Sequence, residues 1–335
     1  MQTALAAIFV FLLVILLHEL GHFTVAKMVG IKVNEFSIGM GPTIFKTKKK
    51  ETQYSLRALP IGGYVSMEGE EEDSNDPNSF NNAHVLARIG VIIAGAFMNF
   101  VLAIVVLSIV SFNTGMPTTT IESTTENSPA QSAGILAGDE IISIENEKID
   151  NWNQVIDEIS DEEPGNTIDL SVLRNKEEID LSLTPTTDEE GRTVIGIETR
   201  VEKSLTSAIK GGFQKTGMFL GAMFDFVKMA FRGNVSTRDL SGPVGVIKVV
   251  GDAAKLGFTN VLLILGFISV NLGFFNLLPV PALDGSRLVF LIIELIRGKP
   301  IDPAKENFVH VVGFFLLIAL MIVVTYRDLI RINIF

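Results

Sequence analysis

The stretch Ala4-Leu5-Ala6-Ala7-Ile8-Phe9-Val10-Phe11-Leu12-Leu13-Val14-Ile15-Leu16-Leu17 runs directly into His18-Glu19-Leu20-Gly21-His22 near the start of the chain. Counted on through Met28, the segment is about 25 residues long. At 1.5 Å per residue, a helix of this length crosses a hydrocarbon core of about 30 Å. Because residues 4–17 have no polar face, the sequence predicts a membrane-spanning helix and not the surface helix of a soluble domain.

The polar pentapeptide inside this helix carries metal-binding chemistry. Positions i and i+4 share one helix face, so His18 and His22 can offer ring nitrogens to a single zinc ion. Glu19 stands beside them as a candidate general base. The alternatives are a chance match to the motif and a pair of histidines that are satisfied in a core. Ionisable groups are costly inside a span, and this cost favours the functional interpretation.

The composition separates an acidic segment from a membrane body. The chain has 335 residues, of which 47% are hydrophobic, and is long for one ordinary soluble domain. Residues 117–200 hold 20 acidic and 5 basic residues, a net charge of −15; the remaining 18 acidic and 22 basic residues give +4. This distribution does not suit nucleic-acid binding. Since the chain contains no cysteine, disulfides and thiolate metal sites are excluded.

Four segments are long and apolar enough to span a membrane: residues 4–28, 89–112, 261–283 and 308–326. Lysines gather at 46–50, between the first and second segments, and Arg297, Lys299 and Lys305 lie between the third and fourth. The positive-inside rule places both connections in the cytoplasm, with the N-terminus and the acidic insert outside. Arg327 and Arg331 then violate the rule mildly. The first helix lacks the flanks of a cleaved signal peptide, so we expect it to be retained.

The segments between the spans have distinct patterns. Residues 31–84 contain short β-prone runs broken by glycine and proline, which predicts hairpins and then a polar loop on the cytoplasmic side. The insert alternates expected strands (141–145, 167–173, 179–183, 194–197) with a helix at 152–159. Residues 213–232 predict an amphipathic helix lying on the outer leaflet. The expected divisions are 1–30, 31–84, 85–113, 117–200, 205–255, 256–300 and 306–335.

A catalytic zinc usually has three protein ligands and an open fourth position, so a third ligand is needed. Among the carboxylates in apolar surroundings, Asp284 is the best candidate, because it follows the prolines of Asn276-Leu277-Leu278-Pro279-Val280-Pro281-Ala282-Leu283-Asp284-Gly285. Those prolines must break the helix and free backbone groups. The predicted topology puts Asp284 and His18 at similar depth, toward the cytoplasm. The alternative is a helix-ending turn residue just outside the membrane.

The chain resembles the site-2 protease family of intramembrane zinc metalloproteases, and in particular its bacterial regulator-of-sigma-E branch. The resemblance covers nearly the whole chain. It rests on the HELGH at 18–22, on the glycine-rich and prolyl motifs at 39–42 and 60–65, on Gly95 to Asn99, on Ser241-Gly242-Pro243-Val244-Gly245, and on residues 271–285. The insert is similar to the family's PDZ domain through Ser128-Pro129-Ala130 and residues 133–139. Only one such domain fits here, and Ser286 replaces the family's common second glycine.

The resemblance implies a polytopic α-helical membrane protein with four transmembrane helices, a membrane-associated β-hairpin region and an inserted extracytoplasmic α+β PDZ domain. It implies one Zn²⁺ per chain, held by His18, His22 and Asp284, with Glu19 as the base. Asn271 and Asn276 are candidates to bind the substrate backbone, and a polar contact between spans is their alternative. The implied partners are the lipid bilayer of the bacterial cell membrane and trimmed single-span proteins such as an anti-sigma factor or a signal-peptide remnant.

Two other classes of protein remain open. A non-enzymatic membrane scaffold would use the PDZ domain to gather partners and carry a vestigial HExxH. The full set of three ligands and Glu19 disfavours this reading. A metal transporter would need polar residues along several spans, and the fourth span has none between Phe314 and Val324. The PDZ domain itself is expected to act either as a size filter or as a receptor for peptide ends.

Overall fold

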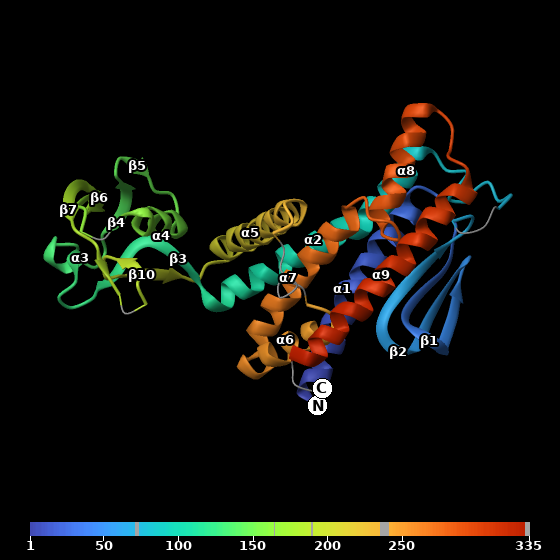
Figure 1. Cartoon of the computed structure of the whole chain (residues 1–335), viewed down its shortest axis with the longest axis horizontal. Helices are drawn as coiled ribbons and strands as arrows, with labels where there is room; N and C mark the ends of the chain where they lie inside the picture. Colours follow the sequence, from blue (N-terminus) through green and yellow to red (C-terminus); the bar gives the residue numbers. More distant parts are fainter. Residues whose placement is uncertain (71–73, 164, 189, 235–240, 332–335) are drawn as a thin grey trace. The chain divides into compact units, whose positions relative to one another are not determined.

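The computed structural model describes residues 1–335 except 71–73, 164, 189, 235–240 and 332–335. It divides into two compact units, one formed by residues 1–110 and 209–335 and the other by residues 111–208 (Figure 1). Small parts of the predicted polar loop, of the linker after the amphipathic helix and of the C-terminal tail therefore lie outside the described residues.

The first unit is built from helices and one small sheet. Its helices are α1 (Gln2–Met28), α2 (Val85–Thr114), α5 (Leu205–Phe231), α6 (Pro243–Leu256), α7 (Phe258–Leu277), α8 (Asp284–Arg297) and α9 (Pro303–Arg331). Within the described residues, four helices are long and apolar enough to cross a membrane: Gln2–Met28, Val85–Thr114, Phe258–Leu277 and Ala304–Arg331. The four predicted spans are confirmed as helices of that length and composition.

The core of the first unit lies where α1, α2, α6 and α7 meet. Val10 and Val14 of α1 are at most 1% exposed and pack in one cluster with Leu265 of α7 and Val250 of α6. Helix α9 differs, because only 6% of its most apolar 18-residue stretch is buried inside the protein. An apolar helix surface left uncovered by protein is suited to contact with lipid.

The third span ends earlier than its hydropathy predicts. The sequence extends it to Leu283, but α7 stops at Leu277, and Leu278 is already extended with φ −70° and ψ 147°. Leu278 precedes Pro279, and a residue before proline avoids the helical region because of the proline ring. Residues 278–283 therefore form a separate turn, which leads into α8.

Two helices occupy the region predicted as an amphipathic helix and a linker. Helix α5 begins at Leu205, eight residues before the expected start, and it packs on α7 through Phe219 and Phe267, whose ring centroids lie 5.2 Å apart. Helix α6 was not predicted. The Ser241–Gly245 motif spans its N-terminus, with Gly242 as the N-cap residue, and the backbone N–H of Gly245 donates to Asp328 of α9 at 2.7 Å. A carboxylate at this position stabilises a helix N-terminus.

The sheet of the first unit consists of two long bent strands, β1 (Val33–Lys49) and β2 (Thr52–Met67). Residues 33–38 pair with 63–67 on one side and with 53–56 on the other, and residues 43–49 pair with 52–57. The result is four short strands in the order 63–67, 33–38, 53–56, 43–49. Residues 63–67 and 43–49 form the two edges. The predicted hairpins are confirmed.

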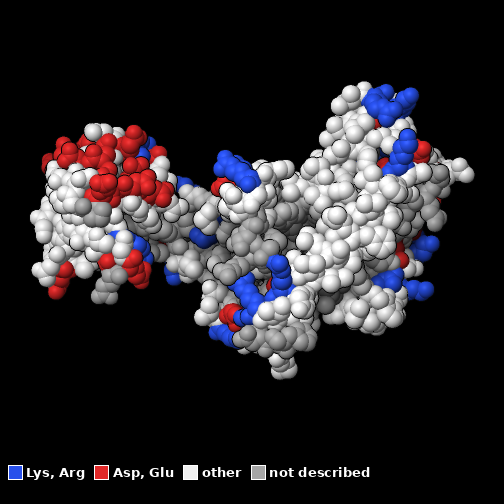
Figure 2. Space-filling model, in the orientation of Figure 1, with Lys and Arg blue, Asp and Glu red and all other residues white. Residues whose placement is uncertain are grey.

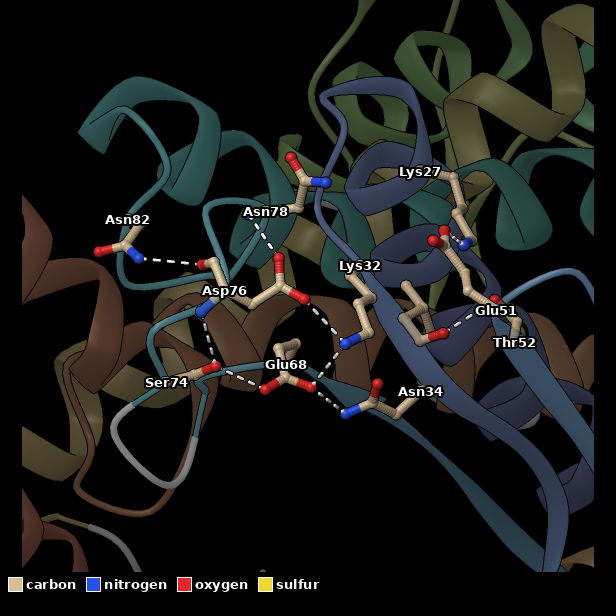
Figure 3. A network of polar contacts seen from close by, with 11 residues as sticks. Lys27, Lys32, Asn34, Glu51, Thr52, Glu68, Ser74, Asp76, Asn78 and Asn82 are labelled. Carbon is tan, nitrogen blue, oxygen red and sulfur yellow. Dashed lines mark hydrogen bonds and ion pairs between the residues drawn. The ribbon is translucent and has the colours of Figure 1, made fainter.

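Polar contacts fix the start of this sheet to the loop that follows it (Figure 3). The Nζ of Lys32 lies 2.8 Å from Oδ2 of Asp76 and 3.3 Å from Oε2 of Glu68. Glu68 also accepts from Asn34 and Ser74. The Lys32 hydrogen bond lowers the pKa of Asp76 below its ordinary value, so the network is held in its charged form at neutral pH.

The second unit has its own sheet and core. Its main strands run in the order β10 (Ile197–Glu202), β3 (Met116–Thr124), β4 (Glu140–Ile144), β6 (Ile168–Arg174) and β7 (Glu177–Leu183). The short strands are β5 (Glu147–Lys148), β8 (Thr186–Thr187) and β9 (Thr193–Val194), and the helices are α3 (Pro129–Ser132) and α4 (Trp152–Asp161). Ile121, Ile141 and Ile168 are fully buried in its core. The strands predicted at 141–145, 167–173 and 179–183 and the helix at 152–159 are present. The strand predicted at 194–197 is wrong as a single element, because residues 195 and 196 separate β9 from β10, and β3 was not predicted.

The surfaces of the two units differ in charge. Figure 2 shows acidic side chains gathered on the insert, while much of the visible surface of the helical unit is neither acidic nor basic. Exposed apolar side chains on that unit include Phe314, Phe315 and Leu316 of α9. The division into an acidic insert and an apolar body is confirmed.

Candidate metal centre

Helix α1 presents two histidine rings on one face. His18 and His22 are 6% and 7% exposed, and their Nε2 atoms lie 3.2 Å apart. The i, i+4 spacing produces this pairing directly, because one helical turn brings the two side chains into register. Residues 4–17 before them are all apolar, so the two rings and Glu19 form a polar centre within a membrane-length segment.

Asp284 reaches this centre from the N-terminus of α8. Pro281 and Ala282 occupy the middle of a turn closed by a hydrogen bond of 3.1 Å from the Leu283 N–H to the Val280 carbonyl. Ala282 has φ +72°, as the third position of a type II turn requires. Gly285 follows, where a Cβ would collide with the main chain of Leu278. The turn can therefore fold back against the end of α7, and this fixes Asp284 at the start of α8.

The three donor atoms have the spacing of a tetrahedral zinc site. Oδ2 of Asp284 lies 3.1 Å from Nε2 of His18 and 3.4 Å from Nε2 of His22. Two ligands bound at about 2.0–2.1 Å to a tetrahedral zinc are separated by about 3.3 Å. Within the described residues, this is the one group of three histidine or acidic side chains close enough to hold a metal ion. The donor set of two imidazoles and a carboxylate fits zinc.

Helix α2 lies against the histidine pair because two glycines permit it. A Cβ on Gly95 of α2 would collide with Nε2 of His22, and a Cβ on Gly21 of α1 would collide with the carbonyl oxygen of Ala94. The Nδ1 atom of His22 lies 2.8 Å from the carbonyl oxygen of Val91. This contact holds the His22 ring with its Nε2 atom toward Asp284.

Glu19 lies beside both the candidate ligands and the sheet. A Cβ on Gly63, at the start of the edge strand 63–67, would lie 3.9 Å from Cγ of Glu19, so the side chain lies close to this strand. Glu19 lines a cavity of about 540 Å³ together with all three candidate ligands and with Tyr64, Val65 and Met67. The candidate base and the candidate ligands therefore share one cavity with strand 63–67, which among the described residues pairs only with 33–38.

The two predicted asparagines have different surroundings. Asn276 is 8% exposed, and its Nδ2 lies 3.4 Å from Nε2 of His18. Asn271 donates from Nδ2 to the carbonyl oxygen of Phe267 within α7, at 2.8 Å. The structure brings Asn276 to the centre and gives Asn271 a contact inside its own helix.

A family model supports the interpretation of this geometry. The model of peptidase family M50 matches residues 6–320, which is most of the chain and includes all the candidate site residues. The chain belongs to peptidase family M50.

Curated relatives of this M50 peptidase are similar over their full lengths. A protein of Clostridium acetobutylicum, which its name assigns to the zinc metalloproteases, is 42% identical to this chain. The match covers 97% of this chain and 96% of that protein. The regulator of sigma-W protease RasP of Bacillus subtilis is 32% identical, with 98% of this chain and 99% of that protein covered. The zinc metalloprotease RasP of Geobacillus kaustophilus is 30% identical, with 98% of each chain covered.

Solved structures similar to part of the M50 peptidase include PDZ domains. The PDZ domain of the SdrC-like protein of Listeria innocua matches with 28% identity and a TM-score of 0.24, covering 25% of this chain and 96% of that one. The corresponding domain from Listeria monocytogenes matches with 22% identity and a TM-score of 0.22, and the match covers 25% of this chain and 86% of that one.

Some residues at the centre of the M50 peptidase were not predicted as site residues. His310 of α9, together with Glu70 and Arg287, lines the same cavity as the candidate ligands and also a second cavity of about 260 Å³. Arg287 pairs with Glu70 between the loop after the sheet and α8. No short spacing in the sequence links these residues, because each comes from a different element.

Proposed function

We propose that this zinc metalloprotease hydrolyses a peptide bond within the membrane-spanning segment of single-span membrane proteins. One observation carries the proposal. His18 and His22, two of the three donors of a zinc-like triad, are buried within a helix that is long and apolar enough to span a membrane. Ionisable groups at such a position are costly, and a reaction at membrane depth explains why they are there.

The residues of the candidate metal centre have separate roles in the proposed reaction. His18, His22 and Asp284 hold the metal, which, when bound, lowers the pKa of a water molecule and polarises the scissile carbonyl group. Glu19 shares their cavity, so it can accept the proton of the attacking water and pass it to the leaving amine. The Asn276 amide, beside His18, donates a hydrogen bond to the substrate backbone.

The edge strand at residues 63–67 holds the substrate in an extended form. A peptide bond inside a helix is shielded and already hydrogen-bonded, so the substrate helix must unwind before it is cleaved. Strand 63–67 pairs with 33–38 on one side, and its other edge is beside Glu19, which lies near Gly63 and lines the same cavity as Tyr64 and Val65. An unwound segment added to that edge gains main-chain hydrogen bonds and passes the candidate ligands.

The substrate class follows from the same proposal. A relative of this chain is named a regulator of sigma-W protease. We infer substrates of the anti-sigma-factor kind, trimmed beforehand by another protease, or signal-peptide remnants. The orientation inferred from the loop charges puts the metal centre toward the cytoplasm, so cleavage releases the cytosolic portion of the substrate.

Cleavage in a reconstituted system tests the proposal. The purified chain is placed in liposomes with a single-span reporter, and the products are mapped by mass spectrometry. We expect a cut within the cytoplasmic half of the reporter's span, loss of cleavage on chelation and recovery when zinc is returned. A cut only in the soluble flanks of the reporter, or no cleavage with a full complement of zinc, would contradict the proposal; the second outcome would favour a scaffold.

Cross-linking tests the strand addition separately. Because the chain has no cysteine, single cysteines can be introduced without background. In a Glu19→Gln background, Ser66→Cys on the cavity-side edge should form disulfides with a cysteine scanned through the substrate span. Thr47→Cys, on the opposite edge strand, is the matched control and should not. Equal cross-linking at both positions would remove the cavity-side edge from substrate binding.

The insert offers a groove that favours a peptide receptor over a plain size filter. A cavity of about 400 Å³ lies between α4 and residues 192–197 and is lined by Ile156, Ile159 and Ile195. Trp152, the single tryptophan of the chain, lines it as well. Peptides ending in apolar residues should therefore change the fluorescence of Trp152 on titration. If no such peptide changes it, the filter is the better account.

A further inference from the structure

We propose that Asn99 of α2 is a positioning residue for the metal centre: its side-chain carbonyl Oδ1 accepts a hydrogen bond from the Nδ1–H of His18 and so directs Nε2 of His18 at the metal. The inference rests on the proposed role of His18 as a ligand. Asn99 belongs to the Gly95–Asn99 motif, to which the proposed chemistry otherwise assigns no role.

The contact between the two side chains is direct and buried. Asn99 is 0% exposed, and its Nδ2 lies 3.1 Å from Nδ1 of His18. Its Oδ1 is buried and has no hydrogen-bond partner among the described residues. Buried polar atoms in proteins are nearly always paired, so an unpaired amide oxygen beside an imidazole nitrogen requires an explanation.

The chemistry of a metal-bound histidine supplies that explanation. When Nε2 of a neutral imidazole binds a metal, the ring proton is on Nδ1, which must then donate. A carboxamide NH₂ facing Nδ1 sets a donor against a donor. A half-turn of the Asn99 carboxamide exchanges Oδ1 and Nδ2, which are nearly equal in size. It makes Nδ1–H and Oδ1 partners of one another, and the NH₂ group takes the buried position that Oδ1 leaves.

The same face of α2 serves both histidines. The carbonyl oxygen of Val91 lies 2.8 Å from Nδ1 of His22, so it already acts as the acceptor for that ring. Asn99 stands eight positions later, about two helical turns, and Gly95 lies midway between them. At Gly95 any Cβ would collide with Nε2 of His22, so the glycine leaves room for the rings that the other two residues orient.

The position of Asn99 is itself fixed by the neighbouring helix. The hydroxyl of Ser269 on α7 donates to the main-chain carbonyl of Asn99 at 2.8 Å, and both residues are 0% exposed. A side chain on such a rigid part of the helix can hold one ring orientation. Outer-shell hydrogen bonds of this type typically change metal affinity by about 10- to 100-fold when they are removed.

Zinc affinity of the full-length, detergent-purified chain tests the proposal without relying on cleavage. Competition against a chromophoric chelator gives the affinity for zinc alone. Asn99→Leu, which keeps the volume and loses the acceptor, should weaken zinc binding by about 10- to 100-fold. Asn99→Asp, which keeps the acceptor and loses the NH₂ donor, should bind zinc within about 3-fold of the wild type or more tightly, because carboxylates are common outer-shell acceptors.

A matched control separates this role from general packing. Asn271→Leu makes the same substitution on adjacent α7, where the amide bonds to Phe267 and not to a histidine, and zinc affinity should be unchanged. If Asn99→Leu fails to fold, the zinc affinity of Asn99→Asp alone tests the role of Asn99. Zinc binding as weak in Asn99→Asp as in a histidine-ligand variant, or as tight in Asn99→Leu as in the wild type, would overturn the proposal. Loss of zinc from the wild type itself would instead refute the metal centre.

Discussion

Oδ2 of Asp284 lies 3.1 Å from Nε2 of His18, although 266 positions separate the two residues in the chain. His18 is held by a membrane-length helix, and Asp284 is held by the turn that follows the last residues of another. The prolines at 279 and 281 end α7, and the turn after them aims the carboxylate back at α1. The interruption of the third span is therefore what completes the candidate metal centre.

The role of Glu19 is tested by Glu19→Gln. The amide keeps the shape of the side chain and leaves all three ligands intact, so zinc should remain bound. Cleavage of a single-span reporter should fall by at least about 100-fold, the usual scale for losing a general base. Glu51→Gln, which changes an exposed carboxyl group outside the cavity, is the control and should cleave normally. Substantial residual cleavage by Glu19→Gln would remove Glu19 from the role.

The close approach of α2 to the histidines is tested by Gly95→Ala. The added methyl group would collide with Nε2 of His22, so the ring must turn and zinc should be lost. Gly90→Ala on the same helix is the matched control, because its Cβ would meet Val25 at an ordinary distance of 3.8 Å. Zinc per chain and the melting temperature are measured for both. A Gly95→Ala variant that keeps its zinc would show that α2 can move away from the rings.

Most elements of the fold follow from local patterns in the sequence. Three of the four spans, the hairpins at 33–67, and β4, β6, β7 and α4 of the insert lie close to their predicted positions because hydropathy and turn residues decide them locally. The third span, α7, ends six residues before its predicted end. The pairing of His18 and His22 could likewise be predicted from the sequence, since the i, i+4 spacing places both side chains on one helix face.

The parts that were missed depend on contacts between distant segments. Helix α6 packs on α1, and the hydrogen bond between Gly245 and Asp328 links residues 83 positions apart. Arg287 and His310 reach the cavity from α8 and α9, and no spacing in the sequence joins them to α1. The signal that could have pointed to Asn99 was its four-residue spacing from Gly95, which places both residues on one face of α2.

The stability of the insert should depend on one buried ion pair. Asp139 has a side chain only 1% exposed, and Arg174 lies 2.6 Å from it. Burial opposes the ionisation of Asp139, but hydrogen bonds from Arg174 and from the Leu136 N–H outweigh burial and lower the pKa of Asp139. Since the folded pKa is below the unfolded value of about 3.9, the pair stabilises the insert above that pH and the contribution is lost as pH falls through the folded pKa.

Arg174→Met should therefore destabilise the insert by about 3 kcal/mol at pH 7, because it leaves a buried carboxylate without its partner. The variant should also lose less stability than the wild type on acidification. Unfolding of residues 111–208 by urea, followed through Trp152, measures both effects. Arg200→Met, which removes an exposed pair with Glu122, is the control and should cost less than about 1 kcal/mol. Similar losses for the two variants would show that burial of the pair is unimportant.

The membrane orientation is tested by single cysteines at two exposed positions. Lys48 and Asn175 both have exposed side chains, so a difference in labelling reports the side of the membrane and not burial. In intact cells, an impermeant thiol reagent should label Asn175→Cys and spare Lys48→Cys until the membrane is permeabilised. The reverse pattern would invert the protein and the direction in which the product is released.

The zinc content of the purified chain tests the central claim most directly. Elemental analysis of the wild type should give one zinc per chain, and His22→Ala and Asp284→Asn should both lose most of it, because each removes one of three donors that lie within 4.8 Å of one another. A wild type without zinc, or variants that retain a full equivalent, would contradict the assignment of His18, His22 and Asp284 as the metal centre.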